Sequence, residues 1–295
     1  MDIDNRRNEI VDVKKINNFS FAKNTTYACG GNADIAYFPN SISQATAVYD
    51  YLTESGGDFV ILGNGSNVLA SDNDFKGAVL CTKNLRGISR IDRNKIFCHA
   101  GTKVSELMSF CVEQGLSGLE FLAGIPATVG GLALMNGGAG GIYIANNIVN
   151  VSLYNGSICN FSNKKCNFAY KYSIMRDIKA LILGVELKVF PQDGEKVRAN
   201  ISSYLSHRRF HPKGASCGCV FKNIGNLSAG KLIDDCGLKG LRCGGAYVSD
   251  IHANFLINDG GHAYDIYKLI TIVKEKVFEL TGMKLEEEVV YIGDF

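Results

Sequence analysis

The sequence predicts an α+β fold in which short strands alternate with amphipathic helices. Strand-like runs such as residues 59–62 and 180–190 are separated by helical patterns, and no long strand-helix-strand series is present. Residues 118–141 are rich in glycine, and residues 121–163 contain no Lys, Arg, Asp, Glu or His. At 295 residues, the chain is long enough for two or three domains.

The charge balance favours neither nucleic acid nor a membrane as a partner. The formal net charge is +2, and the basic cluster at residues 207–213 is typical of a solvated loop. Gly, Asn and Pro interrupt the apolar runs before the roughly 20 residues that a membrane span needs. Residues 1–15 lack the apolar core of an export signal, so we expect a cytoplasmic protein.

The cysteines are expected to be reduced thiols, mostly in the core. The chain has ten of them, with no CxxC pair and no Cys/His spacing that indicates a metal site. We therefore expect neither a disulfide framework nor a bound metal.

Helix boundaries follow from capping residues and glycines. Ser41 and Gln44 form a capping box for a helix that ends at Gly56. A second helix is expected to begin with Thr102 as its N-cap and to end at Gly115. The other expected elements are strands at 35–38, 59–62, 78–81, 96–100, 149–154, 159–161, 180–190 and 253–258, helices at 195–209, 228–237 and 263–281, and a strand after the acidic run 286–288.

A glycine turn, residues 63–68, directly follows the buried strand 59–62. It does not complete the G-x-G-x-x-G dinucleotide fingerprint, because Val68 occupies the third glycine position. Its backbone N–H groups instead predict an anion-binding nest, with Ser66 and Asn67 as additional donors. A second glycine segment, residues 225–232, lacks the Ser or Thr of a P-loop, and we interpret Ser228 there as a helix cap.

The glycine-rich stretch 118–141 has two interpretations. A flat ligand that lies on the main chain would require residues without a Cβ. Tight turns in a well-packed sheet would also require glycine. The composition alone leaves both open.

Several stretches together resemble one family, the FAD-dependent UDP-N-acetylenolpyruvoylglucosamine reductases, also called UDP-N-acetylmuramate dehydrogenases. They occur in the family's order from about residue 24 to the end. The compact length is similar to the subclass that lacks an extra tyrosine-bearing loop. The matching stretches are GGNAD (30–34), LGNGSNVL (62–69), GLEFLAGIPATVGG (118–131), YKYS (170–173), CGCVFKN (217–223), SAGKLID (228–234), GLKGLRCGGAYVS (237–249), HANFLIN (252–258) and LEEEVVYIG (285–293).

The resemblance implies a two-part FAD-binding region of the vanillyl-alcohol-oxidase type and a smaller C-terminal α+β substrate domain. We place these parts at residues 1–82, 83–194 and 195–295. FAD would be bound non-covalently, in a region kept dry by the uncharged segment. The implied FAD-binding residues are Gly63, Asn64, Gly65, Ser66, Asn67 and Val68 at the pyrophosphate, and Gly124, Ile125, Pro126, Val129, Gly130 and Gly131 along the flavin.

The activity implied by the resemblance belongs to peptidoglycan precursor synthesis. NADPH reduces FAD, and the enolpyruvyl ether of UDP-N-acetylglucosamine then takes hydride from flavin N5 to give UDP-N-acetylmuramate. Cys219 corresponds to the family's proton donor, which is Ser in many members. A thiol is a stronger acid than an alcohol, so it is competent in this role. Glu288 corresponds to the glutamate that polarises the substrate carboxylate.

One catalytic position departs from the family pattern. Lys171 stands where the family's Y-R-x-S motif has arginine, and lysine lacks the planar fork that binds a carboxylate through two bonds. Two alternatives to an active reductase are therefore open: a flavin-binding pseudoenzyme, or another flavin oxidoreductase of the same fold. The implied substrate-binding residues are Tyr170, Lys222, Asn223, His252 and Asn254. We expect a monomer whose partner is the small UDP-sugar.

Overall fold

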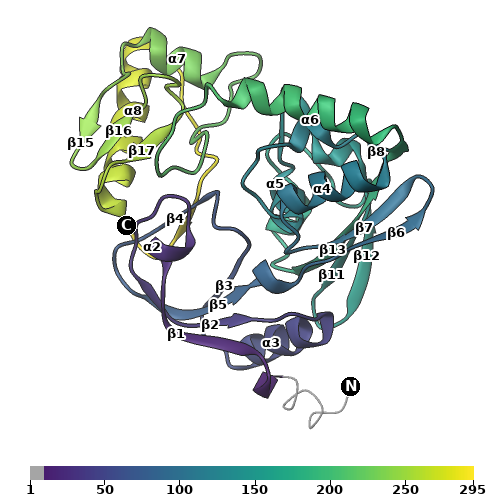
Figure 1. Ribbon diagram of the computed structural model, residues 1–295. Helices are drawn as coiled ribbons and strands as arrows, with labels where there is room; N and C mark the ends of the chain where they lie inside the picture. The colour runs from purple at the N-terminus through teal and green to yellow at the C-terminus, as the bar shows by residue number, and fades with distance from the viewer. Residues whose placement is uncertain (1–9) are drawn as a thin grey trace. The chain divides into compact units, whose positions relative to one another are not determined.

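The computed structural model describes residues 10–295 (Figure 1). The first nine residues of the expected domain 1–82 lie outside the described part. The chain forms two compact units. Unit 1 comprises the described residues up to Ile16 together with 36–64 and 78–209, and unit 2 comprises residues 17–35, 65–77 and 210–295. Helices and strands occur in both, which confirms the α+β class.

Unit 1 contains a five-stranded antiparallel sheet in the order β12-β11-β13-β7-β6. Its central strand β13 is almost wholly buried, whereas the edge strand β12 alternates between exposed and half-buried residues. Alternation is typical of a strand with one solvated face, and β12 has it whereas β13 does not. The strands are β6 (Ile88–Asp92), β7 (Lys95–His99), β11 (Ile148–Tyr154), β12 (Ile158–Ser162) and β13 (Leu181–Lys188).

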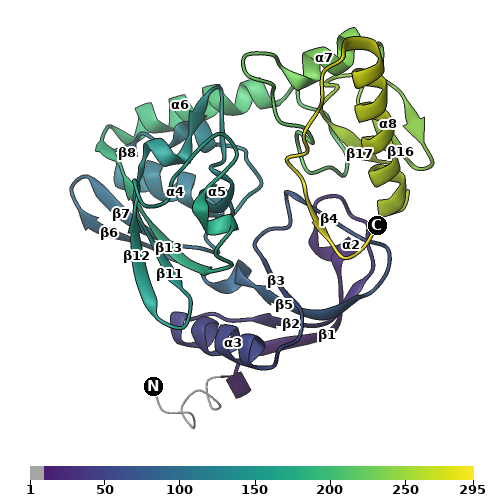
Figure 2. The same cartoon turned by 180° about the vertical axis from the view of Figure 1, so that it is seen from behind.

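Helices α3 and α5 pack against β13, and α4 packs against α6. Figures 1 and 2 show α4 and α5 on the same side of the five-stranded sheet. α3 and α5 therefore cover the buried strand. Val104 N donates to Ala127 O at 3.1 Å, which places the segment before α5 next to the start of α4. The helices are α3 (Ile42–Glu54), α4 (Val104–Gln114), α5 (Val129–Met135) and α6 (Gly194–Arg208), and the 3-10 turns of unit 1 are η1 (Thr82–Asn84), η2 (Glu120–Leu122), η3 (Ile144–Asn146) and η4 (Ile174–Arg176).

The predicted start of α3 is confirmed, and that of α4 is wrong by one residue. Ser41 Oγ accepts a hydrogen bond from Gln44 N at 3.1 Å, as a helix cap does. In α4 the N-cap is Lys103, and its N–H donates to the Glu106 carboxylate. The Thr102 hydroxyl bonds instead to both main-chain groups of Gly87. The Thr102 hydroxyl, which the sequence pattern predicted as a helix cap, is therefore engaged in a tertiary contact with Gly87 instead.

A four-stranded sheet has the order β1-β2-β5-β3, with β3 parallel to β5. Three further strand pairs are small. The strands are β1 (Lys14–Ser20), β2 (Asn32–Phe38), β3 (Phe59–Leu62), β5 (Phe75–Cys81), and the short pairs β8 (Leu116–Ser117) with β14 (Phe190–Pro191), β9 (Gly138–Ala139) with β10 (Ile142–Tyr143), and β4 (Val68–Ala70) with β18 (Val290–Ile292).

Unit 2 has one hydrophobic core built around α8, which packs on all three strands of the sheet β15-β16-β17. Ile266, Leu269, Ile270, Val273 and Val277 form the buried stripe of α8. Its bounds agree with the predicted helix, and Gly282 ends it in the left-handed conformation. The elements are α2 (Phe21–Asn24), α7 (Ala229–Asp235), β15 (Arg242–Cys243), β16 (Ala246–Val248), β17 (Leu256–Asn258) and α8 (Ala263–Thr281).

The start of α8 is capped by a residue far away in sequence. The Asp72 carboxylate accepts hydrogen bonds of 2.9 Å from Ala263 N and from Tyr264 N. These are two of the N–H groups that a helix leaves without an internal partner. Asp265 adds a local cap by accepting from His262 N. The segment 65–77 is therefore fastened to the long helix of unit 2.

All ten cysteines are free thiols, and six of them are buried, which confirms that most lie in the core. Among the described residues, no group of three or more His, Cys, Asp or Glu side chains could hold a metal ion. The helices of residues 10–295 include none that is long and apolar enough to cross a membrane.

Candidate flavin and substrate site

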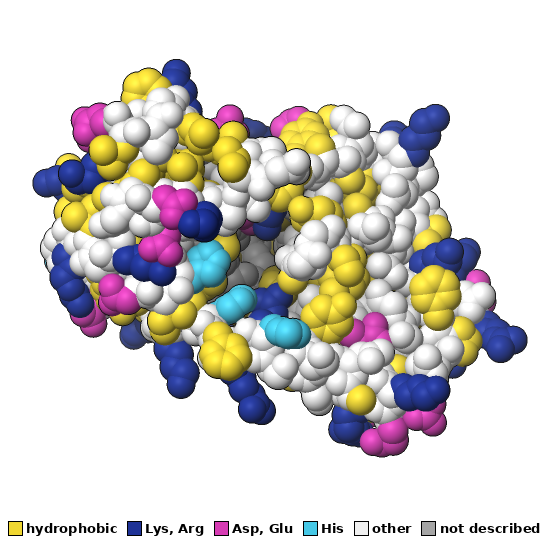
Figure 3. All heavy atoms as spheres, turned by 90° about the horizontal axis from the view of Figure 1, so that it is seen from above, with side chains coloured by type: hydrophobic (Ala, Val, Ile, Leu, Met, Phe, Trp, Pro, Cys, Tyr) yellow, Lys and Arg dark blue, Asp and Glu magenta, His cyan; other side chains and the backbone are white. Residues whose placement is uncertain are grey.

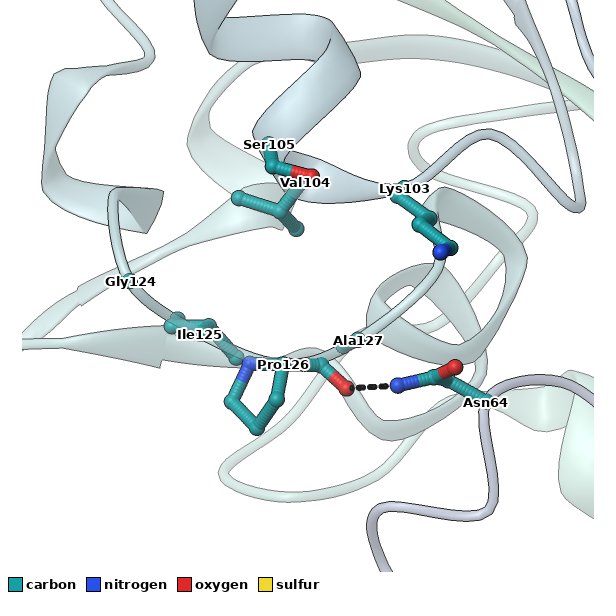
Figure 4. A pocket seen from close by; sticks show the side chains of 8 residues that line it. All are labelled: Asn64, Lys103, Val104, Ser105, Gly124, Ile125, Pro126 and Ala127. Atoms are coloured by element: carbon teal, nitrogen blue, oxygen red, sulfur yellow. Dashed lines mark hydrogen bonds between the residues drawn. The ribbon is translucent and has the colours of Figure 1, made fainter. Parts of the chain in front are cut away.

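A pocket of about 300 Å³ in unit 1 contains several of the residues expected to bind FAD (Figure 4). The loop 124–127 forms one wall, and the start of α4 lies opposite. Asn64 joins the loop through a 2.7 Å hydrogen bond from its Nδ2 to Pro126 O. The structure therefore brings together the glycine turn and the Gly-Ile-Pro segment, which are 60 residues apart in sequence.

Four residues that line this pocket were missed in the sequence: Lys103, Val104, Ser105 and Ala127. Lys103 and Ser105 line it at the start of α4. The N-terminus of a helix attracts anions through its free N–H groups and its dipole. A lysine and a serine at the start of a predicted helix were the signal that could have identified them.

The glycines of this region are required mainly by packing within the protein. A Cβ on Gly63 would lie 2.7 Å from Thr128 Oγ1, and one on Gly130 would lie 2.8 Å from Ala100 Cβ. Gly124 has a φ of +78°, and a Cβ there would lie 2.6 Å from Arg208 Cδ. Of the two interpretations of the glycine-rich stretch 118–141, tight turns and close packing therefore explain Gly124 and Gly130.

The chemistry of the pocket fits an anionic, partly aromatic cofactor. Its lining holds one cation, Lys103, and no carboxylate. Val104, Ile125 and Pro126 supply apolar surface, while Asn64 and Ser105 supply polar groups. Such a lining suits the phosphates and the rings of FAD better than it suits a cationic ligand.

The rest of the glycine turn, residues 65–68, belongs to unit 2. Two of its carbonyl groups accept hydrogen bonds from main-chain N–H groups of that unit. Gly65 O accepts from Thr26 N at 3.0 Å, and Asn67 O accepts from Val290 N at 3.0 Å. Gly65 has a φ of +66°, and a Cβ there would lie 2.6 Å from Asn24 O. These contacts fix the course of residues 65–68 in unit 2.

Cys219 lies on an extended segment held between two neighbours of unit 2. It forms an antiparallel bridge with Phe255, and Phe221 forms one with Glu287. Gly218 precedes the thiol with a φ of +84°, and no atom lies within 4 Å of a Cβ built there. Glycine is therefore needed at position 218 for its conformation rather than for space.

Asn254 is 2% exposed, and its side chain bonds to this same segment. Its Oδ1 accepts from Phe221 N at 2.8 Å, and its Nδ2 donates to Phe221 O at 2.9 Å. Both polar groups of its amide therefore bond to the main chain of Phe221, and Oδ1 also accepts from Val220 N at 3.2 Å. Asn254 therefore holds the main chain of the segment that carries Cys219.

The surroundings of His252 favour the neutral form of its imidazole ring. Its Nδ1 accepts a hydrogen bond from Asn254 N at 3.2 Å, and burial lowers the pKa of the ring. Histidine side chains are visible on the face shown in Figure 3. In unit 2, the rings of His252 and His211 lie 6.5 Å apart, and the His252 ring lies 5.1 Å from that of Phe255. His252 is thus half-buried in an aromatic group beside the Cys219 segment.

Glu288 is fixed to the Cys219 segment through its main chain. Its N–H donates to Val220 O at 2.7 Å, one residue beyond Cys219. Lys222, on the same segment, contacts Glu286 through its Nζ at 3.4 Å. Asn223 Oδ1 accepts from Ala229 N at the start of α7. The four predicted residues Cys219, Lys222, Asn223 and Glu288 therefore belong to one hydrogen-bonded region of unit 2.

Cys217 is chemically distinct from Cys219, although only Gly218 separates them. Cys217 is buried, and burial raises the pKa of its thiol to about 12, with nearby Glu288 and Cys219 adding to the increase. Cys219 is only half-buried. Cys217 therefore stays protonated at neutral pH, and Cys219 is the more accessible thiol of the pair.

Lys171 and Tyr170 form the tip of a tight turn in unit 1. Ala169 and Tyr172 exchange both of their main-chain hydrogen bonds, and Lys171 has a φ of +56°. A positive φ at the third residue is a feature of type II turns. Asn136 Nδ2 donates to Ala169 O at 2.8 Å, which joins this turn to the end of α5.

The architecture and the pocket together define a class, the flavin-binding α+β proteins. The family model for an FAD binding domain matches residues 33–158. The model for the C-terminal domain of UDP-N-acetylenolpyruvoylglucosamine reductase matches residues 211–292.

The reductase from Carboxydothermus hydrogenoformans is 35% identical to this chain over 95% of the chain and 94% of that protein. The one from Prochlorococcus marinus is 34% identical over 95% and 99%. The crystal structure of the Thermus caldophilus reductase is 29% identical, has a TM-score of 0.78, and matches 95% of this chain and 99% of that one. The chain belongs to the UDP-N-acetylenolpyruvoylglucosamine reductase family.

Proposed function

We propose that this protein reduces UDP-N-acetylglucosamine enolpyruvate to UDP-N-acetylmuramate with NADPH, as a step in peptidoglycan precursor synthesis. The observation that carries the proposal is the hydrogen bond between Glu288 N and Val220 O, which holds the acid-bearing segment beside the thiol-bearing one in unit 2. Membership of the reductase family supports the same substrate and reductant.

FAD, when bound, supplies the chemistry of hydride acceptance and donation. Within unit 1, we propose that Asn64, Gly63, Val129, Gly130, Gly131 and the segment 124–126 bind it. Lys103 and Ser105 are added to this set because they line the same pocket. Within unit 2, residues 65–68 contribute main-chain N–H groups to the pyrophosphate.

The proton that completes the reduction comes from the Cys219 thiol. In this proposal the substrate's vinyl group gains hydride at one carbon, and the Sγ proton goes to the neighbouring carbon, so that the double bond becomes saturated. Glu288 is proposed to contact the substrate carboxylate through a shared proton or a water molecule, because two carboxylates that face each other directly repel. The hydrogen bond donated in this way stabilises the charge that develops before proton transfer.

The remaining residues hold the substrate. Lys222, Asn223, His252 and Tyr170 are proposed to bind the UDP-sugar directly. Asn254 is proposed to act indirectly, because its amide is occupied by Phe221. Lys171 is proposed to supply the positive charge that arginine supplies in the family's Y-R-x-S motif.

The experiment that tests the function is anaerobic. The purified yellow protein is reduced with NADPH, UDP-N-acetylglucosamine enolpyruvate is added, and flavin absorbance is followed. We expect prompt reoxidation. A flavin that stays reduced, with substrate binding measured separately, would favour the pseudoenzyme or a different acceptor.

The domain division at 1–82, 83–194 and 195–295, a monomeric state and a cytoplasmic location complete the proposal. The two matched segments, 33–158 and 211–292, support separate cofactor and substrate parts. Light scattering of the purified protein tests the monomer, and fractionation of the source cells tests the location.

A further inference from the structure

Both polar groups of the Glu288 main chain are fixed by hydrogen bonds within unit 2. Its N–H donates to Val220 O at 2.7 Å. Its carbonyl oxygen accepts from Asn67 Nδ2 at 3.0 Å. Asn67 also accepts, through its own carbonyl, the N–H of Val290 at 3.0 Å. Asn67 therefore bonds to Glu288 and to Val290, the two residues that flank Val289.

The strand pairing beyond this point continues the same connection. Val68 lies opposite Val290 in the parallel pair of β4 and β18. Asn67 thus directly precedes β4, whose pairing with β18 begins at Val68. One hydrogen bond joins Asn67 to Glu288 and a second joins it to Val290, so a movement of the turn at residue 67 would reach the segment that carries Glu288.

Asparagine suits this position because its side chain carries an amide donor. Alanine removes the donor and leaves the Glu288 carbonyl without this partner. Aspartate places a carboxylate oxygen where the donor was, and two acceptors then face each other. Either change releases one side of the Glu288 peptide, and the carboxylate that extends from this residue loses part of its fixed direction.

We propose that Asn67 is a positioning residue that couples occupation of the glycine turn by FAD to the orientation of Glu288. The inference rests on the proposed function for the role of Glu288. A bound pyrophosphate restrains the peptides of residues 63–68. Through Asn67 that restraint reaches Glu288, so the Glu288 side chain is best ordered when the cofactor is present.

The first test separates the two halves of the reaction in FAD-saturated protein. In Asn67→Ala we expect flavin reduction by NADPH to stay within about threefold of wild type. We expect reoxidation by UDP-N-acetylglucosamine enolpyruvate to slow about 10- to 100-fold, the effect of a small misplacement of a catalytic group. Equal slowing of both steps would overturn the proposal.

A double-mutant cycle tests the route through Glu288. In the Glu288→Gln background, Asn67→Ala should cause little further slowing of reoxidation, because the group that Asn67 positions is already removed. Full additivity of the two effects would mean that Asn67 acts by another route. The matched control is Asn64→Ala, which removes an amide from the same turn that bonds to Pro126 instead. Its effect should add to that of Glu288→Gln.

Hydrogen exchange gives a readout that does not depend on turnover. We expect FAD to slow amide exchange of residues 286–290 in the wild type, and this protection to shrink in Asn67→Ala. Equal protection in both proteins would overturn the coupling. A wild type that never reduces the substrate would refute the proposed function, while the exchange measurement would still decide the role of Asn67.

Discussion

The N–H of Glu288 and the carbonyl oxygen of Val220 are joined by a 2.7 Å hydrogen bond, which fixes the glutamate one residue away from Cys219 in the pairing of their segments. Neither side chain makes this bond. The proposed acid and the proposed polarising carboxylate are therefore held in register by the main chain, and substitutions of their side chains leave that register intact.

Replacement of Cys219 by alanine should separate the two half-reactions. We expect Cys219→Ala to keep flavin reduction by NADPH and to slow substrate reduction by about 10²- to 10⁴-fold, the range for loss of a general acid. Stopped-flow absorbance of the flavin measures both steps. The control is Cys159→Ala, which removes another half-buried thiol, in unit 1. Loss of FAD binding in Cys219→Ala alone would make this cysteine structural.

Lys171 should be required for its charge. We expect Lys171→Ala to slow substrate reduction about 10²-fold or more, as the loss of an electrostatic contact in an active site does. Lys179→Ala is a matched control, because Lys179 also has a positive φ, of 46°, in the same unit. It should have little effect on steady-state turnover.

Lys171→Arg tests the departure from the family pattern. Arginine restores two parallel bonds to a carboxylate, so we expect turnover equal to or above that of the wild type. Activity in this variant combined with none in the wild type would identify the natural protein as a pseudoenzyme.

Protonation of His252 should destabilise the fold in acid. Burial lowers the pKa of this ring, and its Nδ1 accepts a bond from Asn254 N that the protonated ring cannot accept. The unfolded chain therefore binds the proton more readily. The stabilisation is complete above the unfolded pKa of about 6.5 and is lost as the pH falls from there towards the lowered folded value.

Urea unfolding at pH 7.5 and 5.5 measures this effect. The midpoint of the wild type should fall more between the two conditions than that of His252→Asn, whose amide oxygen accepts the bond without titrating. The same fall in both proteins would assign the acid sensitivity to other groups.

The cap on α8 should contribute to the stability of unit 2. Asp72→Ala removes two hydrogen bonds from the helix start, and we expect a loss of about 1 to 2 kcal/mol in the free energy of unfolding. Asp235→Ala is the control, because its ion pair with Lys231 joins side chains that are 57% and 72% exposed. Its cost should be about 0.5 kcal/mol or less. Equal losses in a urea titration would contradict the role of Asp72.

Apolar spacing and capping residues predicted the helices whose bounds depend on residues close together in sequence. In α8 the apolar spacing and Gly282 agree, and the predicted bounds are confirmed. Thr102 failed as a cap because its hydroxyl bonds to Gly87, a contact that local spacing does not encode.

The sequence predicted which segments form the candidate site, but not how those segments lie relative to one another within each unit. The bond from Asn67 to Glu288 spans 221 residues, and the place of Lys103 opposite the Gly-Ile-Pro loop depends on how α4 packs. Such contacts arise from tertiary structure, where single-sequence patterns carry little information.

The pairing of Val68 with Val290 has a consequence for biosynthesis. Unit 2 draws on residues 17–35, 65–77 and 210–295, so its early segments leave the ribosome long before their partners exist. Closing loops of this length is slow, and β4 lacks its partner strand until β18 has been made. We infer that this unit assembles only once the C-terminal strand has been released, and that the nascent chain depends on protection from aggregation until then.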